Sequence, residues 1–313
     1  MAKLIVVGSA GADINVPPHD PPPPGQMITV SSLGMQIGGS GFYTAIVASR
    51  LGISTAFAGV LGNDVIGQMV REKLRAERVD VTRLSLLPER YSPITLIYNR
   101  SRGDPSYVQH PGTNADYKLP PVLPRVPCRM VHLASPEMFG GLWPNGVVEF
   151  VRQLKVNQKT VSVDTFAVGK GAEYNVREHR HLFDLVDIVF TNEHQAKLVS
   201  GRSEWESVVR YFLERGVSVV VVKCGPKGAI VASKGRIEKV PPARVKAVDP
   251  QGAGDHFVAG FLAGHIRGLD PLASARLGCK LGALCVCYRG VLTGTADAGR
   301  LKKVTSVFAA SRR

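Results

Sequence analysis

The chain has 313 residues, of which 44% are hydrophobic and 20% are charged, and this composition is ordinary for a globular protein with an ample core. No apolar run approaches the ~20 residues that a membrane span needs, and an odd count of five cysteines, mostly in apolar segments, indicates reduced thiols and a cytoplasmic protein. The formal net charge is +14, but the basic residues are scattered without a nucleic-acid-binding motif, so we expect neither nucleic acid nor membrane as a partner.

The chain begins with a short apolar run, residues 3–9 (KLIVVGS), that ends in small residues. Such a run is typical of a buried strand with a loop at its C-terminal end, and Asp13 falls in that loop. Taken alone, Asp13 is as consistent with a turn residue as with a ligand-binding one. Residues 17–25 (PPHDPPPPG) cannot form a helix, because proline fixes φ and lacks an N–H donor. We expect strands at 26–36 and 92–98, and a turn at 99–104.

The middle of the chain alternates strands and helices. Gly38 and Gly39 precede a helix predicted at 42–51. The later predicted strands cover 129–135, 160–164, 187–192 and 217–223, and the predicted helices cover 145–156, a segment from 193, and 205–215. The last strand is nearly all β-branched, which is typical of a strand buried on both faces. This alternation predicts an α/β fold, a doubly wound three-layer α/β/α sandwich with ligands at the C-terminal strand ends. We expect a single domain over residues 1–313.

Residues 248–265 (VDPQGAGDHFVAGFLAGH) combine a turn, a glycine-rich loop and a helix. Pro250 starts the turn, and the segment Gly252–Gly254 leaves the backbone almost uncovered. The free N–H groups and the positive end of a helix dipole bind anions, phosphate above all. Asp255 at this position either caps the helix or accepts a proton from a hydroxyl that attacks a phosphate. The helix also carries a stripe of small residues suited to close packing: Ala259, Gly260, Ala263 and Gly264.

This stretch resembles the signature Asp-Thr-X-Gly-Ala-Gly-Asp of the ribokinase-like (pfkB-type) carbohydrate and nucleoside kinases. Five positions match, namely Asp249, Gly252, Ala253, Gly254 and Asp255, while Pro250 stands where most members have Thr. The resemblance implies that Asp255 is the catalytic base and that the Gly252–Gly254 amides form the anion hole. It covers nearly the whole chain, with the motifs in the family's order.

The resemblance also implies an acceptor site and a lid. Asp13 would hydrogen-bond substrate hydroxyls, because a carboxylate can accept two hydrogen bonds at once. The substrate-binding residues that the family pattern points to are Asp13, Gly38, Gly39, Tyr43 and Asp249. Tyr43 departs from the pattern, since the family usually has Asn there, and it could stack on a ring or reshape the pocket. Segments of about 15–36 and 91–110 would form a small β lid that excludes water, and we expect a homodimer formed through this lid.

The nucleotide side follows from two further motifs. The family's Asn-Xaa-Xaa-Glu motif, which arranges magnesium, water and phosphate, appears here with Asn192 but with Gln195 in place of Glu, so Gln195 is at most an outer-shell metal contact. The segment from Lys223 to Gly228 resembles the family's loop beside ATP and adds Lys223, Gly225 and Gly228 as nucleotide-binding residues. The expected cofactors are ATP, Mg²⁺ and a monovalent cation such as K⁺ beside the last helix.

We therefore predict an ATP-dependent kinase that transfers the γ-phosphoryl group to a hydroxymethyl group of a small ribose- or fructose-like sugar. One alternative is a nucleoside kinase of the adenosine type, in which Tyr43 contacts the base. Another is a sugar-binding or regulatory homologue whose catalysis is weakened by Tyr43 and Gln195.

Overall fold

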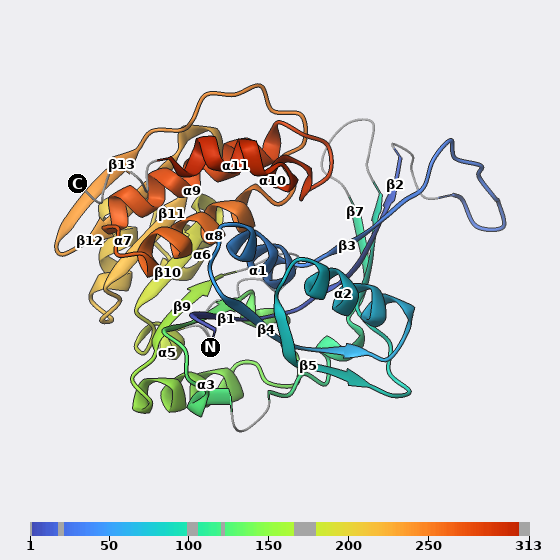
Figure 1. The fold of residues 1–313 in the computed structure, drawn as a ribbon, viewed down its shortest axis with the longest axis horizontal. Coiled ribbons are helices and arrows are strands. Elements are labelled where there is room, and N and C mark those ends of the chain that lie inside the picture. The colour runs from blue at the N-terminus through green and yellow to red at the C-terminus, as the bar shows by residue number, and fades with distance from the viewer. Residues whose placement is uncertain (1, 18–21, 99–105, 120–122, 166–179, 307–313) are drawn as a thin grey trace.

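A nine-stranded sheet forms the centre of the fold in the order β13-β12-β11-β10-β9-β8-β1-β4-β5 (Figure 1). The computed structural model describes residues 2–17, 22–98, 106–119, 123–165 and 180–306. The strands are parallel except β12 and β13, which are antiparallel. Their bounds are β1 Leu4–Gly8, β4 Thr55–Gly62, β5 Asp80–Leu87, β8 Met130–Ala134, β9 Thr160–Asp164, β10 Ile188–Asn192, β11 Val219–Lys223, β12 Ala229–Ser233 and β13 Arg236–Val240.

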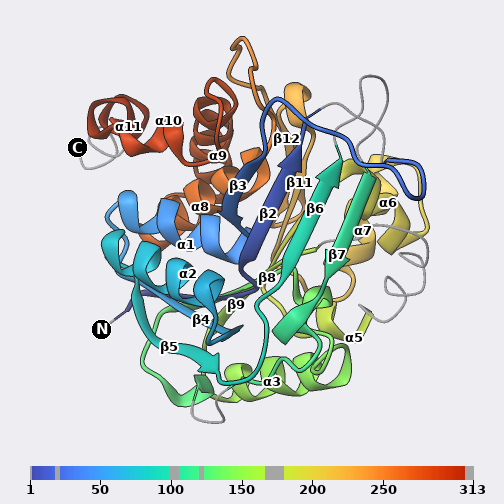
Figure 2. The same ribbon diagram turned by 90° about the vertical axis from the view of Figure 1, so that its right-hand side faces the viewer.

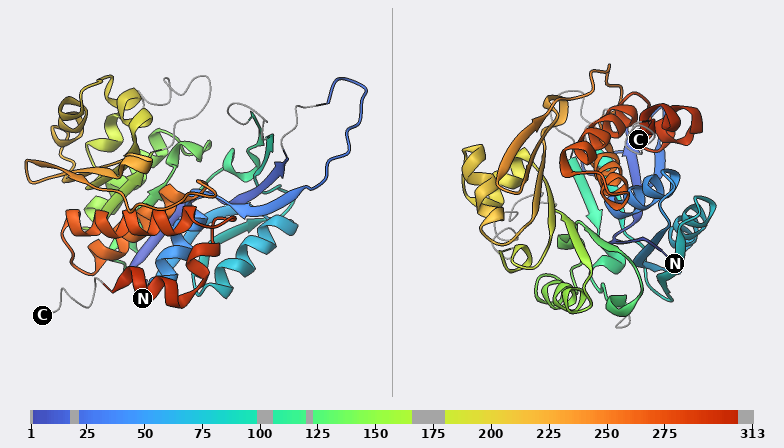
Figure 3. Two further views of the ribbon diagram at one scale, coloured as in Figure 1. Left: turned by 90° about the horizontal axis from the view of Figure 1, so that it is seen from above. Right: turned by 60° about the vertical axis from the view of Figure 1, so that its left-hand side comes forward.

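Helices cover both faces of this sheet, which confirms the predicted three-layer α/β/α sandwich. One face packs against α1 (Ser40–Arg50), α2 (Val65–Ala76), α8 (Ala253–Ile266), α9 (Pro271–Val286) and α11 (Ala298–Thr305), the last preceded by α10 (Thr293–Ala296). The other packs against α3 (Asn145–Val156), α5 (Arg180–Phe183), α6 (Glu193–Ser200) and α7 (Trp205–Leu213). Consecutive residues of one strand enter opposite cores, as Val220 and Val221 do, because side chains alternate across a sheet. The layers are visible in the left panel of Figure 3.

Helix α8 is buried between the sheet and α9, and its small residues make that possible. A Cβ atom added to Gly260 would lie 2.6 Å from Leu281 Cδ1 and 3.1 Å from Gly278 Cα. Glycine inside a helix costs about 1 kcal/mol relative to alanine, so the close approach of α9 accounts for its presence. The predicted packing of the small stripe is confirmed, and the first turn of α8 is thereby fixed against the core. No helix among the described residues is long and apolar enough to cross a membrane.

A second sheet of four strands, in the order β3-β2-β6-β7, stands beside the sandwich (Figure 2). Its strands are β2 Gly11–Val16, β3 Gly34–Gly38, β6 Ile94–Tyr98 and β7 Ser106–His110. Two expectations were wrong in detail. Asp13 lies within β2 and not in a loop, and the strand expected at 26–36 forms only over Gly34–Gly38, where β2 offers paired backbone. The turn expected at 99–104 lies outside the described residues.

Both sheets meet near the carboxyl end of β1. From β1 the chain adds β4 and β5 on one side and later β8, β9, β10 and β11 on the other, so β1 is where the strand order reverses. Ligands bind at such switch points, outside the carboxyl ends of the strands. Strand β2, which carries Asp13, leaves directly from the end of β1 and leads into the second sheet.

Candidate active site

The glycine-rich loop ends in a left-handed residue that starts α8. Gly252 has φ of 73° and is the N-cap of the helix, and a Cβ atom there would collide with Val291 Cγ1. The helix begins at Ala253, so Asp255 lies in its first turn and does not cap it. This placement excludes the capping role that the sequence left open for Asp255. The N–H groups of a first helical turn have no partner within the helix, and the dipole adds positive charge there.

The carboxyl group of Asp255 has a strongly perturbed environment. Burial and the negative charge of Asp164 raise its pKa, while the positive charge of Lys223 lowers it, and the net result is a pKa of about 7. The residue is nevertheless half-buried, so a ligand can reach it. A carboxylate poised near neutral pH, at the positive end of a helix, has the properties of a general base.

Asp164 and Lys223 form a buried ion pair beside this carboxylate. They end the strands β9 and β11, and Lys223 Nζ lies 2.7 Å from both carboxylate oxygens of Asp164. Their side chains are 8% and 16% exposed. A Cβ atom added to Gly254 would lie 3.5 Å from Lys223 Nζ, so the ammonium group sits against the first turn of α8. The sequence analysis assigned Lys223 to the nucleotide-binding segment with Gly225 and Gly228. It missed Asp164, and the one sequence feature that could have identified this residue is its position at the end of a buried strand.

The residues predicted to bind the acceptor come together on α1 and the second sheet. The Asp13 carboxylate packs so closely on Gly38 that a Cβ atom there would collide with Oδ2. The buried hydroxyl of Tyr43 donates to the Ile37 carbonyl at 3.0 Å. Burial raises the pKa of Tyr43, and the charges of Asp13 and Asp255 raise it further, which places this phenol near both carboxylates. Gly39 starts α1 with φ of 125°, a conformation that glycine adopts readily.

The loop before α8 is fixed by backbone contacts and by the second sheet. Asp249 accepts hydrogen bonds from the Gln251 amide at 3.1 Å and from the Gly290 amide at 3.2 Å. Gln36 of β3 donates to the Gln251 side chain at 2.9 Å, so the second sheet touches the glycine-rich loop. The structure thus gives Asp249 a role in holding the loop, while its contact with a substrate stays a prediction.

A hydrogen-bonded chain behind the loop was not foreseen from the sequence. Arg50 Nη1 donates to Thr295 Oγ1 at 3.0 Å, which lies 3.3 Å from His256 Nε2, while His256 Nδ1 lies 2.9 Å from the Gly252 carbonyl. Because a carbonyl only accepts, Nδ1 carries the proton and Nε2 accepts from the threonine hydroxyl. Burial lowers the pKa of His256 to about 4, which keeps the ring neutral. This series of hydrogen bonds therefore holds the Gly252 carbonyl from the interior of the protein.

Asn192 and Gln195 form a capping box at the start of α6. The Asn192 side chain accepts from the Gln195 amide at 2.8 Å, and the Gln195 side-chain oxygen accepts from the Asn192 amide at 3.2 Å. Such a box satisfies two otherwise unpaired donors. The oxygen of Gln195 is therefore already used by the helix end, which weakens the case for a metal contact.

The Gly225–Gly228 segment is a tight turn after β11. The Cys224 amide donates to the Gly228 carbonyl at 2.8 Å. Gly228 has φ of 92°, and a Cβ atom there would collide with the Val240 carbonyl. Across this turn, Lys227 approaches Glu193 of α6 at 3.5 Å, so the predicted nucleotide-binding segments after β10 and β11 are neighbours.

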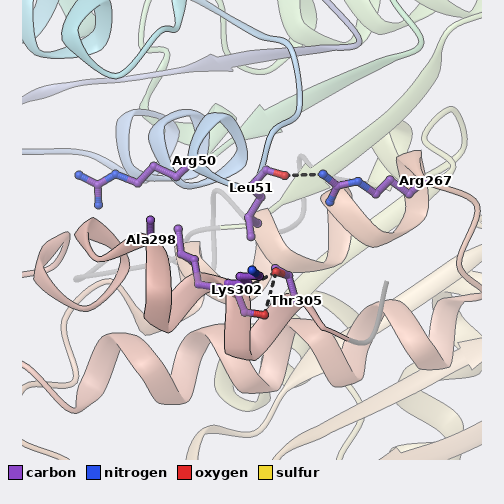
Figure 4. A pocket seen from close by; sticks show the side chains of 7 residues that line it. Arg50, Leu51, Arg267, Ala298, Lys302 and Thr305 are labelled. Carbon is purple, nitrogen blue, oxygen red and sulfur yellow. Dashed lines mark hydrogen bonds between the residues drawn. The ribbon is translucent and has the colours of Figure 1, made fainter. Parts of the chain in front are cut away.

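A pocket of about 250 Å³ lies at the opposite end of α8 (Figure 4). Its lining contains none of the predicted site residues. Its arginines are engaged, since Arg50 pairs with Glu77 at 2.6 Å and Arg267 donates to the Leu51 carbonyl. One of its lining residues, Arg50, also belongs to the hydrogen-bonded chain behind the glycine-rich loop.

Comparison with known proteins identifies relatives over most of the chain. The model of the pfkB family of carbohydrate kinases matches residues 1–298. The chain is 25% identical over 300 residues to the ribokinase of Haemophilus influenzae, covering 92% of this chain and 93% of that protein. It is 26% identical over 310 residues to a nucleoside kinase of Methanothermobacter thermautotrophicus, covering 96% and 94%. The fold is similar to that of Arabidopsis thaliana ribokinase complexed with ribose and ATP, with a TM-score of 0.84, 24% identity and coverage of 97% and 99%.

Proposed function

Because the chain belongs to the pfkB family of carbohydrate kinases, we propose that it transfers the γ-phosphoryl group of ATP to a hydroxymethyl group of a small ribose- or fructose-like sugar. The family and the relatives make it an ATP-dependent kinase of sugars or nucleosides. The observation that carries the finer proposal is the position of Asp255, a carboxylate with a raised pKa in the first turn of α8.

The transfer balances with the groups that the site provides. The acceptor's hydroxyl oxygen forms a bond to the γ-phosphorus, and the bond from this phosphorus to the bridging oxygen of ADP breaks. The acceptor proton passes to Asp255, and ADP leaves with the electron pair. Positioning and charge stabilisation supply most of the catalysis in such reactions. The amides of Gly252–Gly254 lie at the helix end where the transferred negative charge would be held.

The acceptor would be held between Asp13 and the wall formed by Tyr43. The charges of Asp13 and Asp255 both act on the phenol of Tyr43, and Gly38 allows the Asp13 carboxylate to pack closely on its backbone. The second sheet would act as a lid over this space, because β3 already reaches the glycine-rich loop through Gln36. Closure would exclude water, which competes with the sugar as an acceptor. In this proposal the chain is one kinase domain with an attached lid.

Nucleotide would bind along the ends of β10 and β11, beside Asn192 and the Gly225–Gly228 turn. Among the described residues, no group of three His, Cys, Asp or Glu side chains could hold a metal ion. Mg²⁺ keeps much of its water when it binds nucleotide phosphates, and Asn192 and Gln195 would contact that water. When bound, Mg²⁺ neutralises phosphate charge. A monovalent cation near the end of α9 remains a prediction from the family.

Two alternatives to a sugar kinase remain: a nucleoside kinase and a homologue with weakened catalysis. The nucleoside kinase relative makes a nucleoside the second candidate, in which the ring of Tyr43 would stack on the base. The weakened homologue is less consistent with the site, because Asp255 keeps its glycines, its helix end and its perturbed pKa. Tyr43 and Gln195 are both held by hydrogen bonds to backbone, so neither position is disordered or strained by its departure from the family pattern.

A homodimer through the lid is supported by one row of apolar side chains. Met35, Ile14, Leu96 and Val108 are register partners across the four strands, on the face opposite Asp13. Met35 is 54% and Val108 is 57% exposed. A contiguous apolar row on an exposed sheet face fits a second copy of the same lid.

We expect the wild-type chain to sediment as a dimer at micromolar concentration, and Met35→Lys with Val108→Lys to sediment as a monomer of unchanged fold. Charges in the apolar row would be buried unpaired by association. The conservative variant Met35→Leu serves as the control and should remain dimeric. A monomeric wild-type protein would contradict the proposal.

Asp255→Asn should lower the rate of phosphoryl transfer by roughly 10²–10⁴, as the loss of a general base does, with nucleotide affinity nearly unchanged. The wild-type kcat/KM should fall about tenfold per pH unit below the raised pKa of about 7, because protonated Asp255 cannot accept a proton. The residual activity of the Asn variant should lack this acidic limb. Wild-type-like turnover in the variant would remove Asp255 from the mechanism.

Asp13→Ala should cost on the order of 2–4 kcal/mol in kcat/KM, since it removes a charged hydrogen bond and misaligns the acceptor. Tyr43→Asn should shift the acceptor profile toward that of ordinary ribokinases. Tyr43→Phe is the matched control, because it keeps the ring and loses only the hydroxyl. Kinetics over matched sugars and nucleosides decide the matter: an Asp13→Ala variant within about twofold of wild type for every acceptor would place the substrate elsewhere.

Gln195→Glu should lower the free Mg²⁺ concentration for half-maximal rate on the order of fivefold, which corresponds to about 1 kcal/mol of charge attraction through water. Glutamate serves a capping box as well as glutamine does, so the melting temperature should not change. Gln195→Ala, which loses the box, should be about 1 kcal/mol less stable without the gain in Mg²⁺ response. An unchanged half-saturation in the Glu variant would show that position 195 does not contact the metal's water.

A further inference from the structure

The ammonium group of Lys223 lies beside the first turn of α8, the helix end at which the proposed anion hole would form. It contacts both oxygens of Asp164 at 2.7 Å and sits against Gly254 in the first turn of α8. Its charge acts on the pKa of Asp255. If Lys223 served only to pair the end of β11 with Asp164 at the end of β9, its position beside the proposed anion hole would have no function.

The charges around Lys223 are mainly negative. The charge of Asp164 raises the pKa of Asp255, and the charge of Glu137 raises the pKa of Asp164. His132, which also lies within range of Lys223, is kept neutral because burial lowers its pKa to about 3. Lys223 therefore supplies positive charge to a cluster of acidic groups. A phosphoryl group arriving there needs such a charge, because the carboxylates would otherwise repel it.

The ammonium group also has a donor to spare. A lysine carries three N–H donors, and the two oxygens of Asp164 account for two of them. The side chain is 16% exposed, so it is not completely closed off from a ligand. Asp164, with 8% exposure, fixes the amine without competing for the ligand. This arrangement is typical of a preorganised charge, which needs little reorganisation when the reaction occurs.

We propose that Lys223 is a further catalytic residue, whose ammonium group donates to an oxygen of the phosphoryl group during transfer, and that Asp164 is the residue that positions it. The inference rests on the proposed function, because it names a group that acts in the same step. In that step Lys223 gains and loses no proton: the acceptor's proton still passes to Asp255, and the bond to ADP still breaks as described above. The charge on the phosphoryl oxygens is shared between Lys223 and the amides of Gly252–Gly254.

The rival explanation is that Lys223 only neutralises Asp164. A buried ion pair can often be replaced by uncharged residues without loss of stability, whereas removal of one partner leaves a buried charge unpaired. The double variant Asp164→Asn/Lys223→Met separates the two explanations. It leaves no unpaired charge at this position, so it should fold even where Lys223→Met alone does not.

The test compares the full-length wild type, Lys223→Met and the double variant with ATP and each of D-ribose, D-fructose and adenosine. We expect kcat to fall roughly 10²–10³-fold in Lys223→Met, as for the loss of one donor to a developing negative charge. Affinity for ADP, measured by calorimetry, should stay within about threefold. The double variant should melt within a few degrees of wild type and remain as slow as Lys223→Met.

A second readout isolates the transferred group. Aluminium fluoride bound with ADP and the fastest acceptor resembles the phosphoryl group in transfer, so its affinity should fall in Lys223→Met by about the same factor as kcat. A double variant restored to within about threefold of wild-type kcat would overturn the catalytic role and leave only charge neutralisation. An active wild type with an equally active Lys223→Met would overturn this inference alone. A wild type that phosphorylates no acceptor would overturn the proposed function as well.

Discussion

The structure depends on keeping one carboxylate reactive in a place where charge is costly. Asp255 is half-buried and lies near the negative charge of Asp164, and both effects contribute to its raised pKa of about 7. Lys223 and the positive end of α8 act in the opposite direction. Without the positive charges that lower its pKa, Asp255 would stay protonated at neutral pH. Without burial, Asp255 would be a much weaker base. The balance is possible only because α8 is fixed between the sheet and α9 by glycine contacts such as that of Gly260 with Gly278.

The fold brings the necessary groups to this carboxylate from distant parts of the chain. The sheet reverses its strand order at β1, and β2 carries Asp13 away from that point into the second sheet. The ends of β9 and β11 supply Asp164 and Lys223, and the loop before α8 is held by Asp249 from one side and by His256 from the other. The second sheet reaches the same loop through Gln36. The proposed acceptor, phosphoryl-group and nucleotide sites would therefore share one edge of the sheet, as expected for a doubly wound fold.

Much of this could be predicted from local sequence patterns. The alternation of strands and helices gave the three layers, and the small residues of α8 indicated its close packing. The glycine-rich helix start at Gly252–Gly254, the proposed anion site, was recognisable because glycines and a helix start are adjacent in sequence. What local patterns missed depends on tertiary pairing. Asp13 is in a strand because β3 and β6 pair with it, and Asp164 finds Lys223 across 59 residues. Gln195 was read through a metal motif, whereas the structure uses its oxygen to cap α6.

The central claim is that this site moves a phosphoryl group from ATP to a primary hydroxyl group. The most direct measurement is ³¹P NMR of the products that the purified chain forms from ATP and Mg²⁺ with a panel of sugars and nucleosides. The account predicts a new phosphomonoester resonance coupled to the two protons of a CH₂ group, formed in equal amount to ADP. ADP accompanied only by inorganic phosphate, or a phosphate on a secondary hydroxyl, would contradict it.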